Sequence, residues 1–105
     1  MTAAVPAGDP GARHELKTWP EFFEAVAGGA KPFEVRRNDR GYRVGDTLVL
    51  REYHPPVPDW NAPGGYTGRE VTRRITYVFD GSGLDEDSVQ PGYVVLGLAV
   101  SDGVR

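Results

Sequence analysis

Side chains that could bind a ligand or catalyse a reaction cluster in the segment 31–40, where charged and apolar residues alternate. Side chains two positions apart on a strand point to the same side, so Glu34 and Arg36 would share one face and Phe33 and Val35 the other. We expect Phe33 and Val35 to face the core, and Glu34 and Arg36 to face a cleft.

Charge is distributed unevenly along the chain. The formal net charge is −3, but residues 31–51 carry six basic and three acidic side chains. Basic groups beside an amide and a carboxylate suit a phosphate and the edge of a nucleobase, and aromatic side chains on a loop can stack on an unpaired base. The residues expected to contact such a ligand are Lys17, Lys31, Glu34, Arg36, Asn38, Arg40, Trp60 and Tyr66. The alternative is a solvated strand face, in which Glu34 and Arg36 form a surface ion pair worth about 0–1 kcal/mol.

One helix must help to position these residues. Thr18 and Glu21 match a capping box, which places a helix over about 18–28 that ends at Gly28-Gly29. An apolar stripe follows at helical spacing. It consists of Trp19, Phe22, Phe23 and Val26. We expect this stripe to be part of the core and not of a ligand site.

Several short strands complete the predicted domain. Glycine (14) and proline (9) are frequent and favour turns between short elements. Apolar patterns predict strands over 14–17, 33–37, 47–53, 69–79 and 93–100. Arg73 falls on the apolar face of the fourth strand, so either a bulge turns it outward, which we favour, or it lines a polar pocket. Residues 54–68 predict a long loop without regular structure, and 84–88 have room for one helical turn. The pattern predicts an α+β domain over 13–102 with a small, mostly antiparallel β-barrel, preceded by a flexible tail at 1–12.

Several classes of site are disfavoured by the composition. No run of about 18 apolar residues is present to span a membrane, and the first residues lack the pattern of a signal peptide. The chain has no cysteine, which excludes disulfides and thiolate metal sites. His14 and His54 stand apart from other metal ligands, so we expect no metal and no cofactor. We expect a cytoplasmic protein that does not bind membranes.

An ordered succession of motifs carries a family resemblance across about residues 13–100. The motifs are His14-Glu15-Leu16-Lys17, the Trp19–Val26 helix, Gly29-x-Lys31-x-Phe33-Glu34-x-Arg36-x-Asn38-Asp39-Arg40, Val44-Gly45-Asp46-x-Leu48-x-Leu50-Arg51-Glu52, Tyr66-Thr67-Gly68-Arg69 and Tyr93-Val94-Val95-Leu96. Together they resemble a bacterial and phage family related to ASCH domains of the PUA-like superfamily. The resemblance implies a PUA-like β-barrel with a helix beside a cleft, and a role with RNA or a modified nucleoside.

The resemblance also raises the question of catalysis. Some ASCH proteins are small amidohydrolases that act on acylated cytidine, and their active strand resembles Gly-x-Lys-Thr-x-Thr-x-Arg. Lys31 and Arg36 match this motif, whereas Glu34 replaces the second threonine. A threonine hydroxyl can be a nucleophile, but a carboxylate would act as general base on water. The later glutamate of those hydrolases has only Glu52 and Glu70 as candidates, by residue type.

We therefore expect an RNA- or nucleotide-binding module with a basic cleft. One alternative is a small amidohydrolase acting on a modified nucleoside such as N4-acylcytidine, with Lys31 and Glu34 as its catalytic residues. The other alternative is a non-catalytic protein-interaction domain.

Overall fold

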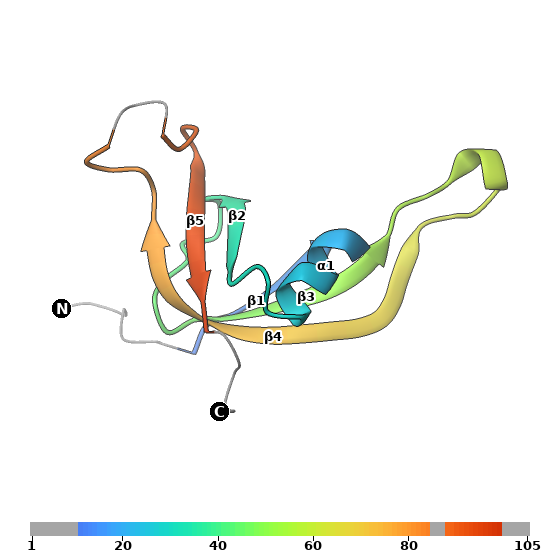
Figure 1. Cartoon of the computed structure of the whole chain (residues 1–105), viewed down its shortest axis with the longest axis horizontal. Coiled ribbons are helices and arrows are strands. Elements are labelled where there is room, and N and C mark those ends of the chain that lie inside the picture. The colour runs from blue at the N-terminus through green and yellow to red at the C-terminus, as the bar shows by residue number, and fades with distance from the viewer. Residues whose placement is uncertain (1–10, 85–87, 100–105) are drawn as a thin grey trace.

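A strongly curved sheet of five strands and one main helix make up the fold (Figure 1). The computed structural model describes residues 11–84 and 88–99. The predicted flexible tail and the helical turn predicted near 84–88 fall mostly outside the described residues. The elements are β1 (Arg13–Thr18), α1 (Pro20–Ala27), β2 (Phe33–Arg37), β3 (Thr47–His54), the 3-10 helix η2 (Pro58–Trp60), β4 (Gly65–Phe79) and β5 (Tyr93–Leu98). The predicted helix and all five predicted strands are thus confirmed, with shifted ends.

The strands follow the order β1-β3-β4-β5-β2 across the sheet. β1 is parallel to β3, and the other neighbours are antiparallel. The long strand β4 pairs first with β3 and then, from Ile75 to Phe79, with β5. In Figure 1 it runs under the molecule and then turns upward beside β5. The outer strands β1 and β2 do not pair, so the sheet is open and the predicted closure into a barrel is not confirmed.

Alternate positions of the strands fill the core. On β5, Val94, Leu96 and Leu98 are buried while the residues between them are only partly covered. Each such buried side chain contributes about 1.5–3 kcal/mol relative to an exposed one. The whole cluster comprises Leu16, Val26, Tyr42, Leu48, Leu50, Ile75, Val94, Leu96 and Leu98.

The inward side of β2 is the reverse of the one predicted. Phe33 and Val35 are exposed, and Glu34 is buried, so the expectation that Phe33 and Val35 face the core is wrong. Glu34 pairs with Leu96 of β5, whose side chain also points inward. Because β2 borders the opening of the sheet, its inner side carries ion-paired polar groups where a central strand would carry core residues.

The start of α1 also differs from the prediction. Trp19 is the N-cap residue, and no side chain caps the helix, so the predicted capping box is wrong. Thr18 instead ends β1, where its hydroxyl donates a hydrogen bond to the Leu16 carbonyl at 3.4 Å. Pro20 occupies the first helical turn, where its missing N–H costs little. At the other end Gly29 has a φ of 88°, a left-handed conformation that favours glycine.

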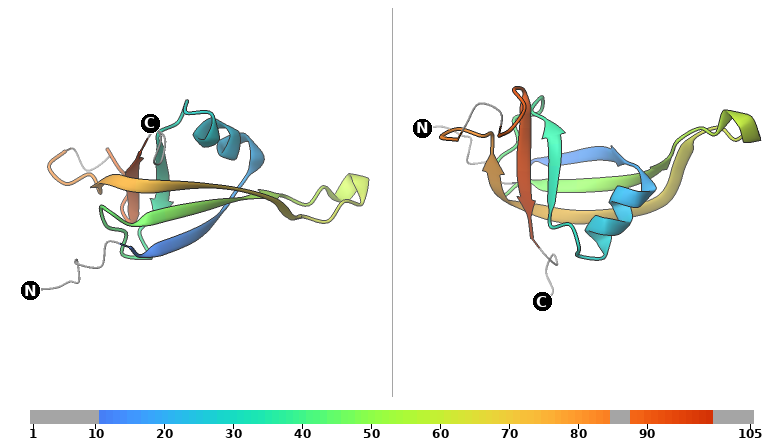
Figure 2. Two further views of the ribbon diagram at one scale, coloured as in Figure 1. Left: turned by 90° about the horizontal axis from the view of Figure 1, so that it is seen from below. Right: turned by 45° about the horizontal axis from the view of Figure 1, so that its top comes forward.

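The helix divides its apolar stripe between two environments. α1 packs against β3 and β4 on one side of the sheet (Figure 2). Phe23 and Val26 are buried as expected, but Trp19 and Phe22 are half-exposed. The prediction that the whole stripe is core is therefore wrong for the two residues nearest the helix start. None of the helices in the described part of the chain is long and apolar enough to cross a membrane.

Arg73 does not sit on a bulge. It pairs with Leu48 in a regular stretch of the β3–β4 ladder, and the register shifts of β4 lie elsewhere. Its guanidinium donates to the carbonyls of Thr72, at 2.9 Å, and Ala27, at 3.5 Å. A cation at the last helical carbonyls is favourable, since it offsets the negative end of the helix dipole. The favoured bulge was thus the wrong explanation for this arginine.

Residues 54–65 form a hairpin arm that projects from the sheet in Figure 1. Within the arm, Val57 and Ala62 exchange backbone hydrogen bonds of 2.8 and 3.1 Å around the 3-10 turn. The prediction of a loop without regular structure is therefore wrong in part. Trp60, at the tip, is 82% exposed.

Candidate functional site

A pocket of about 480 Å³ opens where the end of β1, the start of α1 and β2 meet. Its volume falls in the range of about 300–1,000 Å³ typical of small-molecule sites. It brings together Lys17, Lys31, Glu34 and Arg36, four of the residues predicted to form a cleft. The complete lining is Lys17, Thr18, Trp19, Phe22, Lys31, Glu34, Val35 and Arg36.

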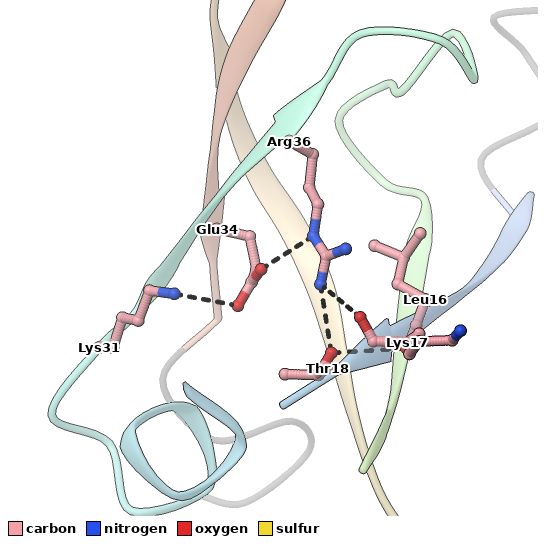
Figure 3. Close-up of polar contacts among 6 residues, drawn as sticks. All are labelled: Leu16, Lys17, Thr18, Lys31, Glu34 and Arg36. Atoms are coloured by element: carbon pink, nitrogen blue, oxygen red, sulfur yellow. Dashed lines mark hydrogen bonds and ion pairs between the residues drawn. The ribbon is translucent and has the colours of Figure 1, made fainter. Parts of the chain in front are cut away.

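Glu34 lies at the centre of the polar side of this pocket. Its side chain is 3% exposed, and it pairs with two cations (Figure 3). Arg36 Nε donates to Glu34 Oε1 at 3.0 Å, and Lys31 Nζ lies 3.4 Å from Glu34 Oε2. The Glu34–Arg36 pair considered from the sequence does form, but its carboxylate is buried and not on the surface. A buried carboxylate is costly unless it is paired in this way.

Arg36 also joins the two outer strands across the opening of the sheet. One of its terminal nitrogens, Nη2, donates to the Lys17 carbonyl and to the Thr18 hydroxyl, each at 3.2 Å. Figure 3 shows the guanidinium reaching from β2 to β1. Side-chain hydrogen bonds thus hold together two strands that backbone pairing does not connect.

Arg40 makes a similar contact outside the pocket. Its Nη1 donates to the Glu15 carbonyl at 3.2 Å, two residues before the carbonyl that Arg36 binds. Burial raises the pKa of the nearby Tyr42 hydroxyl, while the charges of Arg40 and Arg36 act in the opposite direction. Arg40 therefore helps to satisfy a backbone carbonyl on the edge of β1 that no strand pairs with. It was expected to contact a ligand, but it does not line the pocket.

Two half-exposed aromatic rings form the apolar side of the pocket. Trp19 and Phe22 line it from the beginning of α1. Lys31 Nζ lies 5.0 Å from the centre of the Phe22 ring and 5.6 Å from that of Phe33, within cation–π range. Sequence reasoning missed both rings because their helical spacing also fits a core. The available signal was their position, two and five residues after Lys17.

Lys17 stands at the rim of the pocket. Its Nζ lies 4.2 Å from the centre of the Tyr53 ring, which belongs to β3. Its residue is exposed, and none of the described hydrogen bonds or ion pairs involves its ammonium. It is therefore the lining cation with the most freedom to meet an anionic ligand.

The other predicted contacts lie away from the pocket. Trp60 is at the tip of the hairpin arm. Tyr66, at the arm's base, packs edge-to-face on Tyr53 with ring centres 5.1 Å apart, and the Arg51 guanidinium lies 4.0 Å from its ring centre. Asn38 follows β2, and its backbone N–H donates to Gly92. The structure does not bring these three predicted residues together with the pocket.

Neither candidate for a second catalytic glutamate lines the pocket. Glu52 is buried and accepts a hydrogen bond from the Thr67 hydroxyl at 2.8 Å, with Arg69 at 3.6 Å. Glu70 pairs with Arg51 at 3.2 Å. Both carboxylates therefore form contacts between β3 and β4.

His14 belongs to a buried structural pair. Its Nε2 lies 2.9 Å from Asp46 Oδ2, which also accepts the backbone N–H of Arg43 at 3.0 Å. This pair fixes the turn that leads into β3. Within the described residues, no three histidine, aspartate or glutamate side chains gather as a possible metal site.

Comparison with known proteins places the chain among phage-related domains. The model of DUF3850, described as a domain of unknown function, matches residues 13–98. An uncharacterized 12.9 kDa protein in the GpA 3' region of Escherichia phage P2 is 42% identical over 76 residues. That match covers 72% of this chain and 62% of the phage protein, so the chain spans less than two thirds of that relative.

Proposed function

The chain belongs to the DUF3850 family, and we propose that its pocket binds a nucleotide, either free or as one unit of single-stranded RNA. The observation that carries this proposal is the composition of the pocket: two half-exposed aromatic rings, three cations and one buried carboxylate. Aromatic rings stack on the face of any base, cations contact phosphate, and a carboxylate accepts from a base edge.

The charges within the pocket favour an anionic ligand. Glu34 offsets part of the charge of Lys31 and Arg36, and the three cations still exceed the single carboxylate. Lys17, the exposed lysine at the rim, contacts the phosphate. Trp19 and Phe22 stack on the base.

Glu34 acts as a hydrogen-bond acceptor toward the base in this proposal. Each carboxylate oxygen can accept more than one hydrogen bond, so its pairing with Lys31 and Arg36 leaves room for a donor from the ligand. The hydrolase alternative is disfavoured because neither Glu52 nor Glu70, the candidates for the later glutamate of those hydrolases, lines the pocket. We therefore expect no release of cytidine from N4-acylcytidine.

The residues that line the pocket also support a finer assignment of the fold. We propose that the domain is an ASCH-related member of the PUA-like superfamily, with the pocket at the gap between β1 and β2. In support, Lys31 and Arg36, the residues that match the ASCH strand, both line this pocket. An experimental structure with β1 and β2 on opposite sides of the pocket supports the assignment, and one with these strands far apart contradicts it.

Fluorescence anisotropy with a labelled single-stranded RNA octamer tests the proposed function. We expect affinity to fall with salt, with a slope of log K on log salt of about −0.7 per phosphate neutralised. Trp19→Ala should weaken binding by about 1–3 kcal/mol, the usual worth of one stacked base.

The matched control is Arg13→Gln, which removes an exposed cation of β1 that does not line the pocket. It should leave the affinity nearly unchanged. RNA binding that ignores salt, or that responds equally to Trp19→Ala and Arg13→Gln, contradicts the proposal.

A further inference from the structure

We propose that the outer face of β2, β5 and the end of β4 binds the nucleotides next to the one in the pocket. The ligand is then a single strand several nucleotides long and not a mononucleotide. This inference rests on the proposed function of the pocket. We call this surface the outer face, and its outward positions are Phe33, Val35 and Arg37 of β2, Tyr93, Val95 and Gly97 of β5, and Tyr77 and Phe79 of β4.

The first row of the outer face places a glycine between two exposed aromatic residues. Gly97 of β5 pairs with Phe33 on one side and with Tyr77 on the other. Phe33 is 40% exposed and Tyr77 is 62% exposed. A Cβ at Gly97 would lie 3.1 Å from Tyr77 Cβ and 3.4 Å from Thr76 Oγ1, so a larger residue would crowd Tyr77. The row therefore offers two accessible rings on either side of a glycine.

The second row continues the apolar surface. Val95 pairs with Val35, which is 50% exposed, and with Phe79. The rings of Tyr77 and Phe79 are 6.5 Å apart and inclined by only 25°. Tyr77 is exposed and Phe79 is partly exposed, and such nearly parallel rings can stack on the faces of unpaired bases. Contiguous apolar surface of this kind commonly marks an interaction site.

Charge decides which occupant suits this face. The outward positions hold four aromatic residues, two valines, one glycine and one arginine, and no acidic residue. Arg37 lies at one end of β2, with its guanidinium 5.4 Å from the centre of the Tyr93 ring. Lys31 lies at the other end, beside Phe33. Aromatic rings between two cations suit a strand of stacked bases with phosphates on both sides.

The outer face is continuous with the pocket across the edge of β2. Val35 lines the pocket and also belongs to the outer face. The ammonium of Lys31 lies between the Phe22 ring in the pocket and the Phe33 ring on the outer face. A strand that leaves the pocket past Lys31 therefore reaches Phe33 and then Tyr77 without crossing an acidic position.

Comparison of two ligands on the same variants tests this inference. We would measure the affinities of the four ribonucleoside 5′-monophosphates and of a mixed-sequence single-stranded RNA octamer by titration calorimetry. The double variant Phe33→Ser/Tyr77→Ser should weaken octamer binding about 5- to 150-fold per lost base stack and leave mononucleotide binding unchanged. Val44→Ser is the matched control, because it removes an equally exposed apolar side chain away from both sites.

The outcomes separate this inference from the function of the pocket. If the octamer binds no tighter than the mononucleotides, or if the double variant binds it as the wild type does, the outer face is not a binding surface and the pocket function stands. If mononucleotides do not bind and Trp19→Ala leaves octamer binding intact, the pocket function fails instead. Sedimentation of the free protein supplies a third result: a dimer that the double variant dissociates assigns the face to a second copy and overturns the inference.

Discussion

The buried carboxylate of Glu34 links the cations on the polar side of the pocket, so its removal should loosen the opening of the sheet. Glu34→Gln keeps the size of the side chain but removes its charge. The amide also places an N–H₂ group where one of the two cations, Lys31 or Arg36, now finds an acceptor. At least one charge-assisted hydrogen bond is therefore lost.

The contact distances set the size of the effect. Arg36 Nε lies 3.0 Å from Oε1, a good hydrogen bond, whereas Lys31 Nζ at 3.4 Å is beyond the usual range. One hydrogen bond to a charged group is worth about 1.5–3 kcal/mol. We expect this loss and not the roughly 3–5 kcal/mol of a fully buried pair, because both cations are partly exposed. Arg36 also keeps its bonds to β1.

Urea unfolding followed by circular dichroism measures this change. Glu34→Gln should lower the free energy of unfolding by about 1.5–3 kcal/mol without changing the slope with urea. Glu15→Gln is the control, since Glu15 is exposed and its pair with Arg13 is 3.9 Å long, and it should change stability by less than about 0.5 kcal/mol. If Glu34→Gln is as harmless as Glu15→Gln, Glu34 does not hold the opening of the sheet together.

Three further predictions concern the rest of the fold. Asp46→Ala, which removes the partner of His14, should lower the free energy of unfolding by about 1–3 kcal/mol in the same urea assay, and an unchanged midpoint contradicts a structural role for the pair. Gly64→Ala should cost about 1–3 kcal/mol, because the new Cβ would lie 2.7 Å from the Tyr53 hydroxyl; a variant as stable as the wild type would show that the arm yields easily. Burial raises the pKa of Tyr42, so its stabilising contribution is complete below pH 10 and is lost as pH rises through the folded-state pKa. Urea unfolding between pH 8 and 11 should show that stability falls as pH rises, and that it falls less in Tyr42→Phe. If stability falls equally with pH in both proteins, Tyr42 is not the cause of the fall.

Periodicity in the sequence predicted the elements better than their orientation. The period of two over residues 33–37 placed Glu34 and Arg36 on one face, and the structure brings both to the pocket. It did not show which face points inward, because apolar residues were assumed to be inside. At the opening of the sheet that assumption fails, since an ion-paired carboxylate is buried there and Phe33 is exposed.

The candidate site was predicted where it depends on local spacing and missed where it depends on tertiary contacts. Lys31, Glu34 and Arg36, which lie within six residues of one another, line one pocket together with Lys17 of β1. Arg40 was expected to contact a ligand, but its bond to a β1 carbonyl depends on how the sheet curves, which local sequence does not encode. Trp60 was assigned to the site by residue type alone, and the length of the hairpin arm carries it away.

The emission of Trp19 tests most directly whether the pocket binds a nucleotide. The chain has two tryptophans, Trp19 in the pocket and Trp60 at the tip of the arm, so Trp60→Phe leaves a single reporter at the site. We predict that ribonucleoside 5′-monophosphates quench this emission saturably and that Lys17→Gln weakens the effect. In Trp19→Phe, the remaining Trp60 should not respond. Unchanged Trp19 emission at millimolar nucleotide, or an equal response from Trp60, would contradict nucleotide binding in this pocket.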